Sequence, residues 1–236
     1  MRRDYFVFGG VNSLDYDVWF TEARTEDTPS KDVSTEAIAG RNGDLLNDMR
    51  RWKNADVSYG AAILSDFPKK YEALVSALAS KSGYQRLEDS VRPNEYRLAV
   101  FRDAVQPVNT PYNRAGQFDL LFHCKPQRFL KLGDRKISLT GADVVHNPTA
   151  FPAKPLITVY GTAGGTLLVG KYTVQIKSIT EKIVLDCEIQ DAYLGGNNMN
   201  RCIYAPEFPE LTPGKNEVSW TGGITGVDII PRWWTL

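Results

Sequence analysis

The segment Asn147-Pro-Thr-Ala-Phe-Pro-Ala-Lys-Pro155 divides the sequence of 236 residues into two parts. Its three prolines fix their own φ angles, lack backbone donors and push the preceding residues into extended geometry. Such a segment is typical of a stiff linker. Because the chain is longer than most single domains, we predict an N-terminal domain over residues 1–146, a linker over residues 147–155 and a C-terminal domain over residues 156–236.

The distribution of charge supports this division. Up to His146 the chain has 41 ionisable side chains in 146 positions, and after it only 15 in 90 positions. A low charge is expected of a compact β-sandwich with hydroxyl-rich and amide-rich faces. Basic and acidic residues both number 28, so the net charge gives no reason to expect a nucleic acid or an anionic membrane as partner.

One helix is predicted in the N-terminal part. Phe67, Tyr71, Leu74, Val75 and Leu78 form a single apolar stripe at helical spacing. Asp66 or a neighbour can cap the start, Pro68 suits the first turn, and Gly83 can end the helix. Around it the sequence is strand-rich, for example over Tyr96–Phe101 and Gln117–Cys124.

The C-terminal part shows no helical periodicity of useful length. Short β-branched runs recur at Leu156–Tyr160, Thr166–Val169, Tyr172–Ile176, Ile183–Ile189, Glu217–Trp220 and Val227–Ile230. Glycine-rich stretches separate them, and we predict that Gly161–Gly165 is a hairpin turn. The fold class predicted for the whole chain is mainly β: an α+β N-terminal domain with one helix, and a C-terminal antiparallel β-sandwich or jelly roll.

The patterns of nucleophilic and metal-dependent enzymes are missing from this sequence. Asp186 and Glu188 alternate on a predicted strand, which is compatible with a glycosidase carboxylate pair. However, Leu185, Cys187 and Ile189 alternate with them as an apolar face, so we favour a solvated strand face. We therefore predict a protein that is not an enzyme and has no catalytic residue.

No metal or cofactor is predicted either. His123 and His146 each lack a second histidine or a cysteine pair at metal-ligand spacing. Asp191, Asn197 and Asn198 could supply oxygen ligands to Ca²⁺, although ordinary turn chemistry explains the same residues.

The cysteines are few and have no CxxC spacing. Cys124, Cys187 and Cys202 are an odd number, which favours folding in a reducing cytoplasm, with a Cys187–Cys202 disulfide as the alternative. The apolar stretch Tyr5–Phe8 is too short for the core of a signal peptide, and no run is long enough to span a membrane.

Two stretches are candidate contact sites. In the C-terminal Val227-Asp-Ile-Ile-Pro-Arg-Trp-Trp-Thr-Leu236, alternation sends Trp233 and Trp234 to opposite faces, so one of them beside Arg232 could contact a partner or a sugar, while a closing core strand is the favoured alternative. The second stretch is a charged turn formed by Arg41, Asn42, Gly43 and Asp44. It is either a loop at an oligomer interface or an ordinary hairpin turn.

Several stretches, taken in order, resemble the distal tail protein (Dit) family of long-tailed bacteriophages. They are Gly40-Arg-Asn-Gly-Asp-Leu45, Ser82-Gly-Tyr-Gln-Arg-Leu-Glu-Asp89, Tyr96-Arg-Leu-Ala-Val-Phe-Arg102, Phe118-Asp-Leu-Leu-Phe-His-Cys-Lys-Pro-Gln-Arg128, Asn147-Pro-Thr149 to Pro155-Leu156, Asp186-Cys-Glu-Ile-Gln-Asp-Ala-Tyr193 and the Pro-Arg-Trp-Trp ending. They cover most of the chain, and it is their order that makes the resemblance specific.

The resemblance implies a hub at the tail tip of the virion, made and assembled in the cytoplasm of the bacterial host. Its N-terminal domains would close into a homo-hexameric ring around the DNA channel, without sequence-specific DNA binding or membrane insertion, and its C-terminal domain would be a galectin-like sandwich. The implied partners are the tail tube protein, the tail-associated hub or tip protein and a receptor-binding protein. The alternative function is a carbohydrate-binding module that uses Trp220, Trp233 or Trp234.

Overall fold

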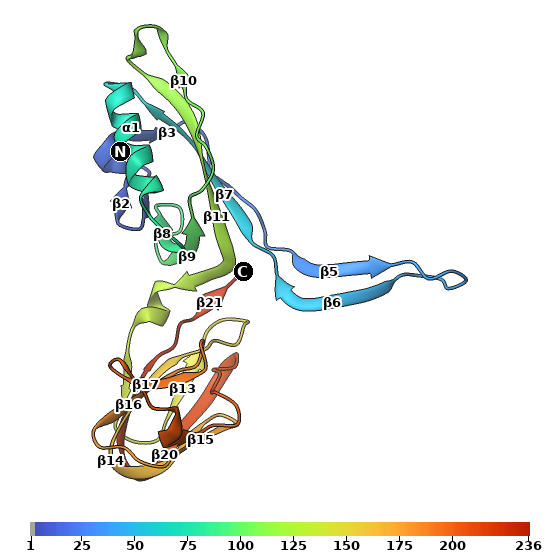
Figure 1. The fold of residues 1–236 in the computed structure, drawn as a ribbon, viewed down its shortest axis with the longest axis vertical. Coiled ribbons are helices and arrows are strands. Elements are labelled where there is room, and N and C mark those ends of the chain that lie inside the picture. Colours follow the sequence, from blue (N-terminus) through green and yellow to red (C-terminus); the bar gives the residue numbers. More distant parts are fainter. Residues whose placement is uncertain (1–2) are drawn as a thin grey trace. The chain divides into compact units, whose positions relative to one another are not determined.

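The computed structural model describes residues 3–236 and divides into two compact units. The first runs to Arg128 and includes Leu236, and the second is Phe129–Thr235. Both are built mainly of antiparallel strands, and α1 (Phe67–Ala79) is the one α-helix in the described part of the chain (Figure 1). The predicted fold class, mainly β with one helix in the N-terminal half, is confirmed.

The first unit contains one large sheet in the order β2-β1-β8-β9-β11-β7-β3. The strands in chain order are β1 (Phe6–Phe8), β2 (Val11–Asn12), β3 (Val18–Phe20), β4 (Thr25–Glu26), β5 (Lys31–Glu36), β6 (Leu45–Trp52), β7 (Ala55–Ile63), β8 (Gln85–Asp89), β9 (Glu95–Val100), β10 (Val108–Asn109) and β11 (Gly116–Leu130). β4 also pairs with β7, and β10 with β11, whereas β5 and β6 form a separate two-stranded sheet.

The core of this unit is aromatic, and α1 contributes to it from one side. Phe67, Leu74 and Leu78 are the buried residues of the helix, as the apolar stripe predicts. Phe67 packs over Gly116, where an added Cβ would lie 2.5 Å from the phenyl ring, so β11 can begin there only because a side chain is missing. Asp66 has a left-handed conformation and makes no capping hydrogen bond, so its predicted capping role is wrong.

The second unit is a curled antiparallel sheet in the order β12-β20-β14-β16-β17-β18, with β13 on β20 and β15 between β14 and β19. The strands are β12 (Ile137–Leu139), β13 (Asp143–Asn147), β14 (Leu156–Val169), β15 (Tyr172–Ile176), β16 (Lys182–Asp186), β17 (Asp191–Leu194), β18 (Asn197–Asn198), β19 (Ile203–Tyr204) and β20 (Gly214–Ile230). The short strand β21 (Trp234–Thr235) is not part of this sheet. Its core consists largely of aliphatic side chains.

The curl comes from two glycine-rich segments that cross in the middle of β14 and β20. The pairing of these strands shifts register between Tyr160 and Gly165. A Cβ on Gly165 would lie 2.2 Å from the backbone oxygen of Thr221, so only glycine permits the crossing. The prediction of a hairpin turn at Gly161–Gly165 is therefore wrong, because the segment is an irregularity inside one continuous strand.

The division of the chain also differs from the expected one. β12 and β13 precede the proline segment, yet both pair with β20 in the second unit. Within the segment, Ala153 forms a β-bridge with Leu211, and the side-chain amide of Asn147 donates to the carbonyl oxygens of Phe151 and Leu211. Residues 147–155 are thus bound into the second unit, and the boundary lies at Arg128 and Phe129 instead of at His146.

Candidate assembly interface

The most exposed part of the first unit is the ribbon formed by β5, β6 and their connecting loop, residues 31–52, here called the arm (Figure 1). Glu36 pairs with Leu45 and Val33 with Asp48, and a register shift follows towards Lys31. Every residue from 33 to 51 is exposed. Neither edge of the ribbon pairs with another strand of residues 3–236, so both faces and both edges are open to solvent.

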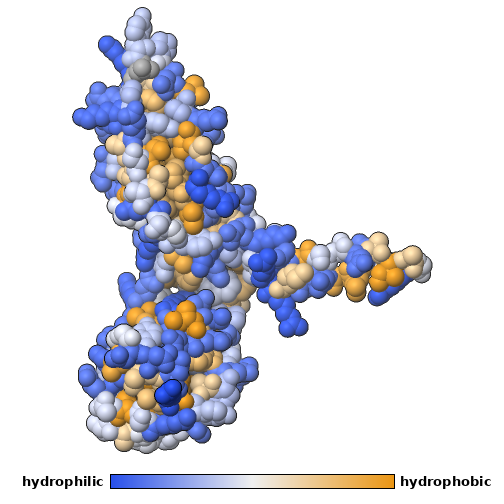
Figure 2. Space-filling view, in the orientation of Figure 1, coloured by the Kyte–Doolittle hydropathy of each residue, from blue (hydrophilic) through white to orange (hydrophobic). Residues whose placement is uncertain are grey.

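Apolar side chains lie along this exposed ribbon. Leu45, Leu46 and Met49 are 45%, 61% and 51% exposed, and Val33 and Ile38 are exposed as well. Figure 2 shows apolar groups along the arm among polar ones. Exposed apolar side chains on a β-ribbon whose outer edges are unpaired are typical of a surface that another protein covers.

The base of the arm is held by polar contacts. Arg51 Nε donates to Asp32 Oδ2 at 2.6 Å, and Lys53 Nζ lies 3.6 Å from the other oxygen of the same carboxylate. The hydrogen bond from Arg51 holds the pKa of Asp32 below its usual value. The amide of Lys53 donates to the carbonyl of Ser30 at 2.8 Å, so the two ends of the ribbon are joined where they leave the sheet.

The charged turn singled out in the sequence lies at the tip of the arm. Arg41, Asn42, Gly43 and Asp44 are all exposed in the loop between β5 and β6. Gly40 and Gly43 have φ angles of +78° and +79°, which glycine adopts without strain, and the amide of Arg41 donates to the carbonyl of Ile38. The turn is therefore a hairpin tip, and its role in an interface stays a prediction.

The C-terminal candidates lie in the second unit. Trp233 is only 3% exposed and belongs to the core. Trp234 stacks on Phe151 with ring centroids 4.5 Å apart and donates its indole N–H to the carbonyl of Pro152 at 2.9 Å. The favoured alternative, a closing core strand, is right about the burial of Trp233, but Trp233 lies just before the short strand β21 and not in it. A partner or glycan contact by these residues stays a prediction.

Arg232 forms a two-point ion pair with Asp186, at 2.7 and 3.1 Å. Burial raises the pKa of Asp186, but the hydrogen bonds and charge of Arg232, with two backbone amides, outweigh it and the pKa is lowered overall. β16 ends at Asp186, and Ile189 is exposed. The predicted strand with Asp186 and Glu188 on one solvated face is therefore wrong, because the chain turns directly after Asp186.

The other polar candidates are engaged in local contacts. The amide groups of Asn198 and Asn200 donate to Asp191 Oδ1 at 2.9 and 2.6 Å, which is the ordinary turn chemistry that the sequence left open. His123 lies between two carboxylates, with Nδ1 2.7 Å from Asp56 and Nε2 2.5 Å from Asp103. Within residues 3–236, no group of three or more His, Cys, Asp or Glu residues is arranged to hold a metal ion.

The cysteines are free thiols. Cys124 and Cys187 are buried and Cys202 is partly buried, and the alternative of a Cys187–Cys202 disulfide is not realised. Burial raises the pKa of both Cys124 and Cys187 to about 12, so neither thiol is an activated nucleophile. Over the same described range, no helix is both long and apolar enough to cross a membrane.

Sequence reasoning found the tip of the arm but missed its apolar sides. The Asn42-Gly43 pair is a local signal for a turn, whereas Leu45, Leu46 and Met49 look like the residues of an ordinary strand. A signal was nevertheless present, because the run from Ala37 to Leu46 places apolar residues on both sides of a charged glycine turn.

Comparison with known proteins gives a match at the level of structure alone. No sequence family and no curated protein matches this chain. The crystal structure of SPP1 Dit (gp 19.1), described as a paradigm of the hub adsorption apparatus in phages that infect Gram-positive bacteria, is similar over 100% of both chains, with a TM-score of 0.72 and 12% identity. The phage p2 baseplate, in its activated conformation with Sr, matches over 97% of this chain and 98% of that one, with a TM-score of 0.48 and 9% identity. This protein is thus Dit-like in fold along its whole length, in agreement with the resemblance drawn from its sequence.

Proposed function

We propose that this protein is the structural hub at the distal end of a long-tailed bacteriophage tail. In this role six copies close into a ring that joins the tail tube to the tail-tip adsorption apparatus, and phage DNA passes through the ring. The observation that carries the proposal is the similarity to SPP1 Dit over the full length of both chains. A match limited to one unit would support only a shared domain.

The arm supports ring closure. A ring of identical copies uses a heterologous interface, in which one surface of a copy meets a different surface of the next. The arm is suited to such an interface because its apolar side chains reach no core of their own chain. Burying an apolar side chain contributes roughly 1.5–3 kcal/mol, so several of them give a neighbouring copy a substantial reason to cover the ribbon.

The proposed partners follow from the ring. Its two faces differ, and one binds the tail tube protein while the other binds the tail-associated hub or tip protein, with a receptor-binding protein attached to the second unit. Assembly takes place in the cytoplasm of the bacterial host. A hub of this kind needs no catalytic residues, and we propose that the protein is not an enzyme.

The carbohydrate-binding alternative has weaker support. It needs an aromatic ring with a free face, and Trp233 is in the core while Phe151 covers one face of Trp234. The contacts of Trp233 and Trp234 are those of a packed chain end, and they give no support for a sugar-binding site.

The test is the native mass of the purified full chain by light scattering behind a sizing column, across a concentration series, with negative-stain images of the heaviest fraction. We expect six-fold rings, formed by the protein alone or after addition of the tail tube protein. A monomer at all concentrations that also fails to form rings with the tube protein would contradict the proposal. Binding of that same monomer to glycans would favour the alternative.

A further inference from the structure

One face of the large sheet in the first unit carries exposed apolar side chains where β3, β7, β11 and β10 run next to one another (Figure 1). α1 packs on the other face, because its Phe67 lies over Gly116 of β11. Neighbouring residues of a strand point to opposite faces, so Gln117 belongs to the face away from α1, here called the outer face. The residues paired in one row with it on the outer face are Trp19, Ala62 and Val108.

The outer face presents apolar side chains at both ends of this row. Trp19 on β3 is 47% exposed and Val108 on β10 is 73% exposed, and neither belongs to a core. The outer face is also long enough for the arm. At about 3.3 Å per residue, the eight residues of β6 extend for roughly 26 Å and the nine residues of β7 for roughly 30 Å. The arm of one copy can therefore lie along the outer face of another, with apolar side chains in contact.

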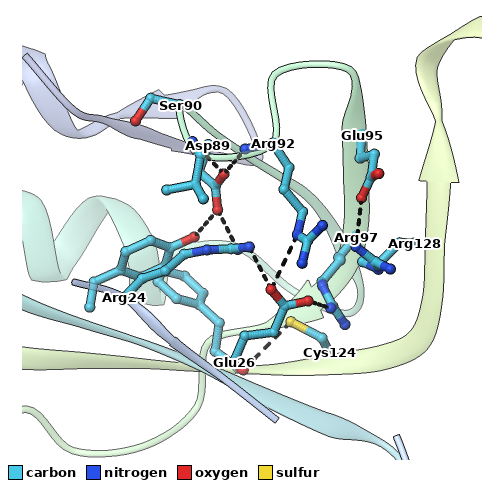
Figure 3. Close-up of polar contacts among 12 residues, drawn as sticks. Arg24, Glu26, Asp89, Ser90, Arg92, Glu95, Arg97, Cys124 and Arg128 are labelled. Carbon is cyan, nitrogen blue, oxygen red and sulfur yellow. Dashed lines mark hydrogen bonds and ion pairs between the residues drawn. The ribbon is translucent and has the colours of Figure 1, made fainter. Parts of the chain in front are cut away.

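Two carboxylates on the outer face lie beside Gly60 of β7. A Cβ on Gly60 would lie 3.6 Å from Asp119 Oδ1 and 3.6 Å from Glu22 Cβ, so the two acidic residues flank the same position. Both are exposed, and neither forms an ion pair within residues 3–236. Buried acidic groups of the same unit are paired inside the chain instead, as Asp89 is with Arg24 at 2.6 Å (Figure 3). The outer face thus offers negative charge that the chain itself leaves unmatched.

The arm carries an unmatched positive charge at Arg50. Three residues of β6, 49–51, lie opposite the single residue Asp32, which is the register shift of the ribbon. At the centre of this bulge Arg50 has a φ angle of +54°, a left-handed conformation that strains a residue with a Cβ. Its amide donates to Asp48 Oδ1 at 2.7 Å, whereas its side chain is exposed and forms no ion pair in the described chain. Bulges re-aim a side chain, and strain at an exposed side chain without contacts points to a role outside its own chain.

We propose that Arg50 of one copy binds Asp119 and Glu22 of the next copy. The apolar side chains of the arm then lie against Trp19 and Val108. This inference rests on the ring proposed above and names the surface that receives the arm. The arm and the outer face are different surfaces of the first unit, as a heterologous interface requires.

The chemistry of the groups suits this contact. A guanidinium presents its N–H groups in a planar fork and can donate to two carboxylates at once. A charged pair at such an interface fixes the register of the two surfaces, while burial of the apolar side chains supplies most of the association free energy.

The first test reverses the two charges separately and together. Arg50→Asp and Asp119→Arg each place like charges opposite one another, so each variant should need about 10- to 100-fold more protein than the wild type to form the same fraction of rings in sedimentation velocity. The double variant restores opposite charges and should assemble within about three-fold of the wild type. Both positions are exposed, and aspartate tolerates a left-handed conformation, so the Tm of the dissociated variants should stay within about 2 °C of a wild-type monomer.

The controls reverse charges away from the proposed contact. Lys69→Asp and Glu72→Arg change exposed side chains of α1, which lies on the other side of the sheet. Both variants should assemble as the wild type does. Single reversals at Arg50 and Asp119 that leave assembly unchanged, or a double variant that assembles no better than the single ones, would overturn the contact.

The second test detects the contact directly in assembled rings. Rings of the Arg50→Lys variant, made from equal parts of unlabelled and isotope-labelled chains, are treated with a water-soluble carbodiimide, which joins an amine to a carboxylate that touches it. We expect mass spectrometry to find a mixed-label peptide pair that links position 50 of one copy to Asp119 or Glu22 of another. Rings that form without this link overturn the contact alone. A chain that forms no rings, with or without the tail tube protein, overturns the ring and the contact together.

Discussion

Replacing the apolar side chains of the arm should weaken assembly without unfolding the protein. The variant changes Leu45, Leu46 and Met49 together to threonine, which keeps a high strand propensity while removing most of the apolar surface. The expected loss of association free energy follows from the exposure of these residues. Leu45 is 45% exposed, Leu46 61% and Met49 51%, and a neighbouring copy could bury that fraction of each. Scaled by roughly 1.5–3 kcal/mol for a fully buried side chain, the loss is about 2–5 kcal/mol per interface.

The assay is sedimentation velocity over a concentration series, combined with thermal unfolding. A loss of about 2–5 kcal/mol corresponds to an association constant lower by about 30- to 4,000-fold, so rings should disappear at concentrations where the wild type forms them. The Tm of the dissociated protein should stay within about 2 °C of a wild-type monomer, because surface substitutions change stability by about 0.5 kcal/mol at most.

The control is Ile189→Thr, which removes an equally exposed apolar residue from the second unit. This variant should assemble as the wild type does. If the triple variant of the arm associates as tightly as the wild type, the arm does not close the ring. If both variants dissociate, exposed apolar surface in general is responsible and the arm has no special role.

Two further predictions concern stability. Gly116→Ala should destabilise the first unit by about 1–3 kcal/mol, because the new Cβ would overlap the ring of Phe67, whereas Gly141→Ala, with open space around it, should be nearly neutral in urea unfolding. Arg232→Met should cost about 1–3 kcal/mol at neutral pH by leaving the carboxylate of Asp186 unpaired. The pKa of Asp186 is lowered in the folded state, so the loss of stability in Arg232→Met should be full above the unfolded pKa of about 3.9. It should vanish as the pH falls through the folded pKa. A loss of stability that stayed constant down to acid pH would contradict the ion pair.

Local patterns predicted the local elements of this fold. The stripe from Phe67 to Leu78 and the proline at position 68 identified α1, since both signals lie within the helix itself. The runs Tyr96–Phe101 and Gln117–Cys124 correspond to β9 and to the first part of β11. In each case the residues that decide the structure are neighbours in the sequence.

The errors arose where a distant partner decides the structure. Leu156–Tyr160 and Thr166–Val169 are separated by glycines and read as two strands, yet they are the two halves of β14, because the glycines cross those of β20 instead of forming a turn. The prolines of residues 147–155 predicted a linker. In the structure, the side chain of Asn147 and the β-bridge at Ala153 instead bind this segment to Leu211, about 60 residues away in the sequence. No pattern within either segment reports these contacts.

The arm illustrates the same limit at the candidate interface. A strand is recognised by its alternation, but whether its edges meet another strand depends on the rest of the sheet. The sequence predicted the turn at Arg41–Asp44 and offered an interface as one of two readings. The exposure of Leu46 and Met49, on which the assembly prediction depends, became visible only when both strands were found to pair with each other and with nothing else in the described chain.

The tolerance of protein cores to substitution explains how the chain can share the fold of SPP1 Dit although no sequence family model matches it. Cores accept many hydrophobic substitutions if volume and patterning are kept, so a fold can persist at 12% identity. The side chains of the arm belong to neither core. Changes in the arm should then alter assembly while leaving the two units intact, and changes in the cores should do the reverse.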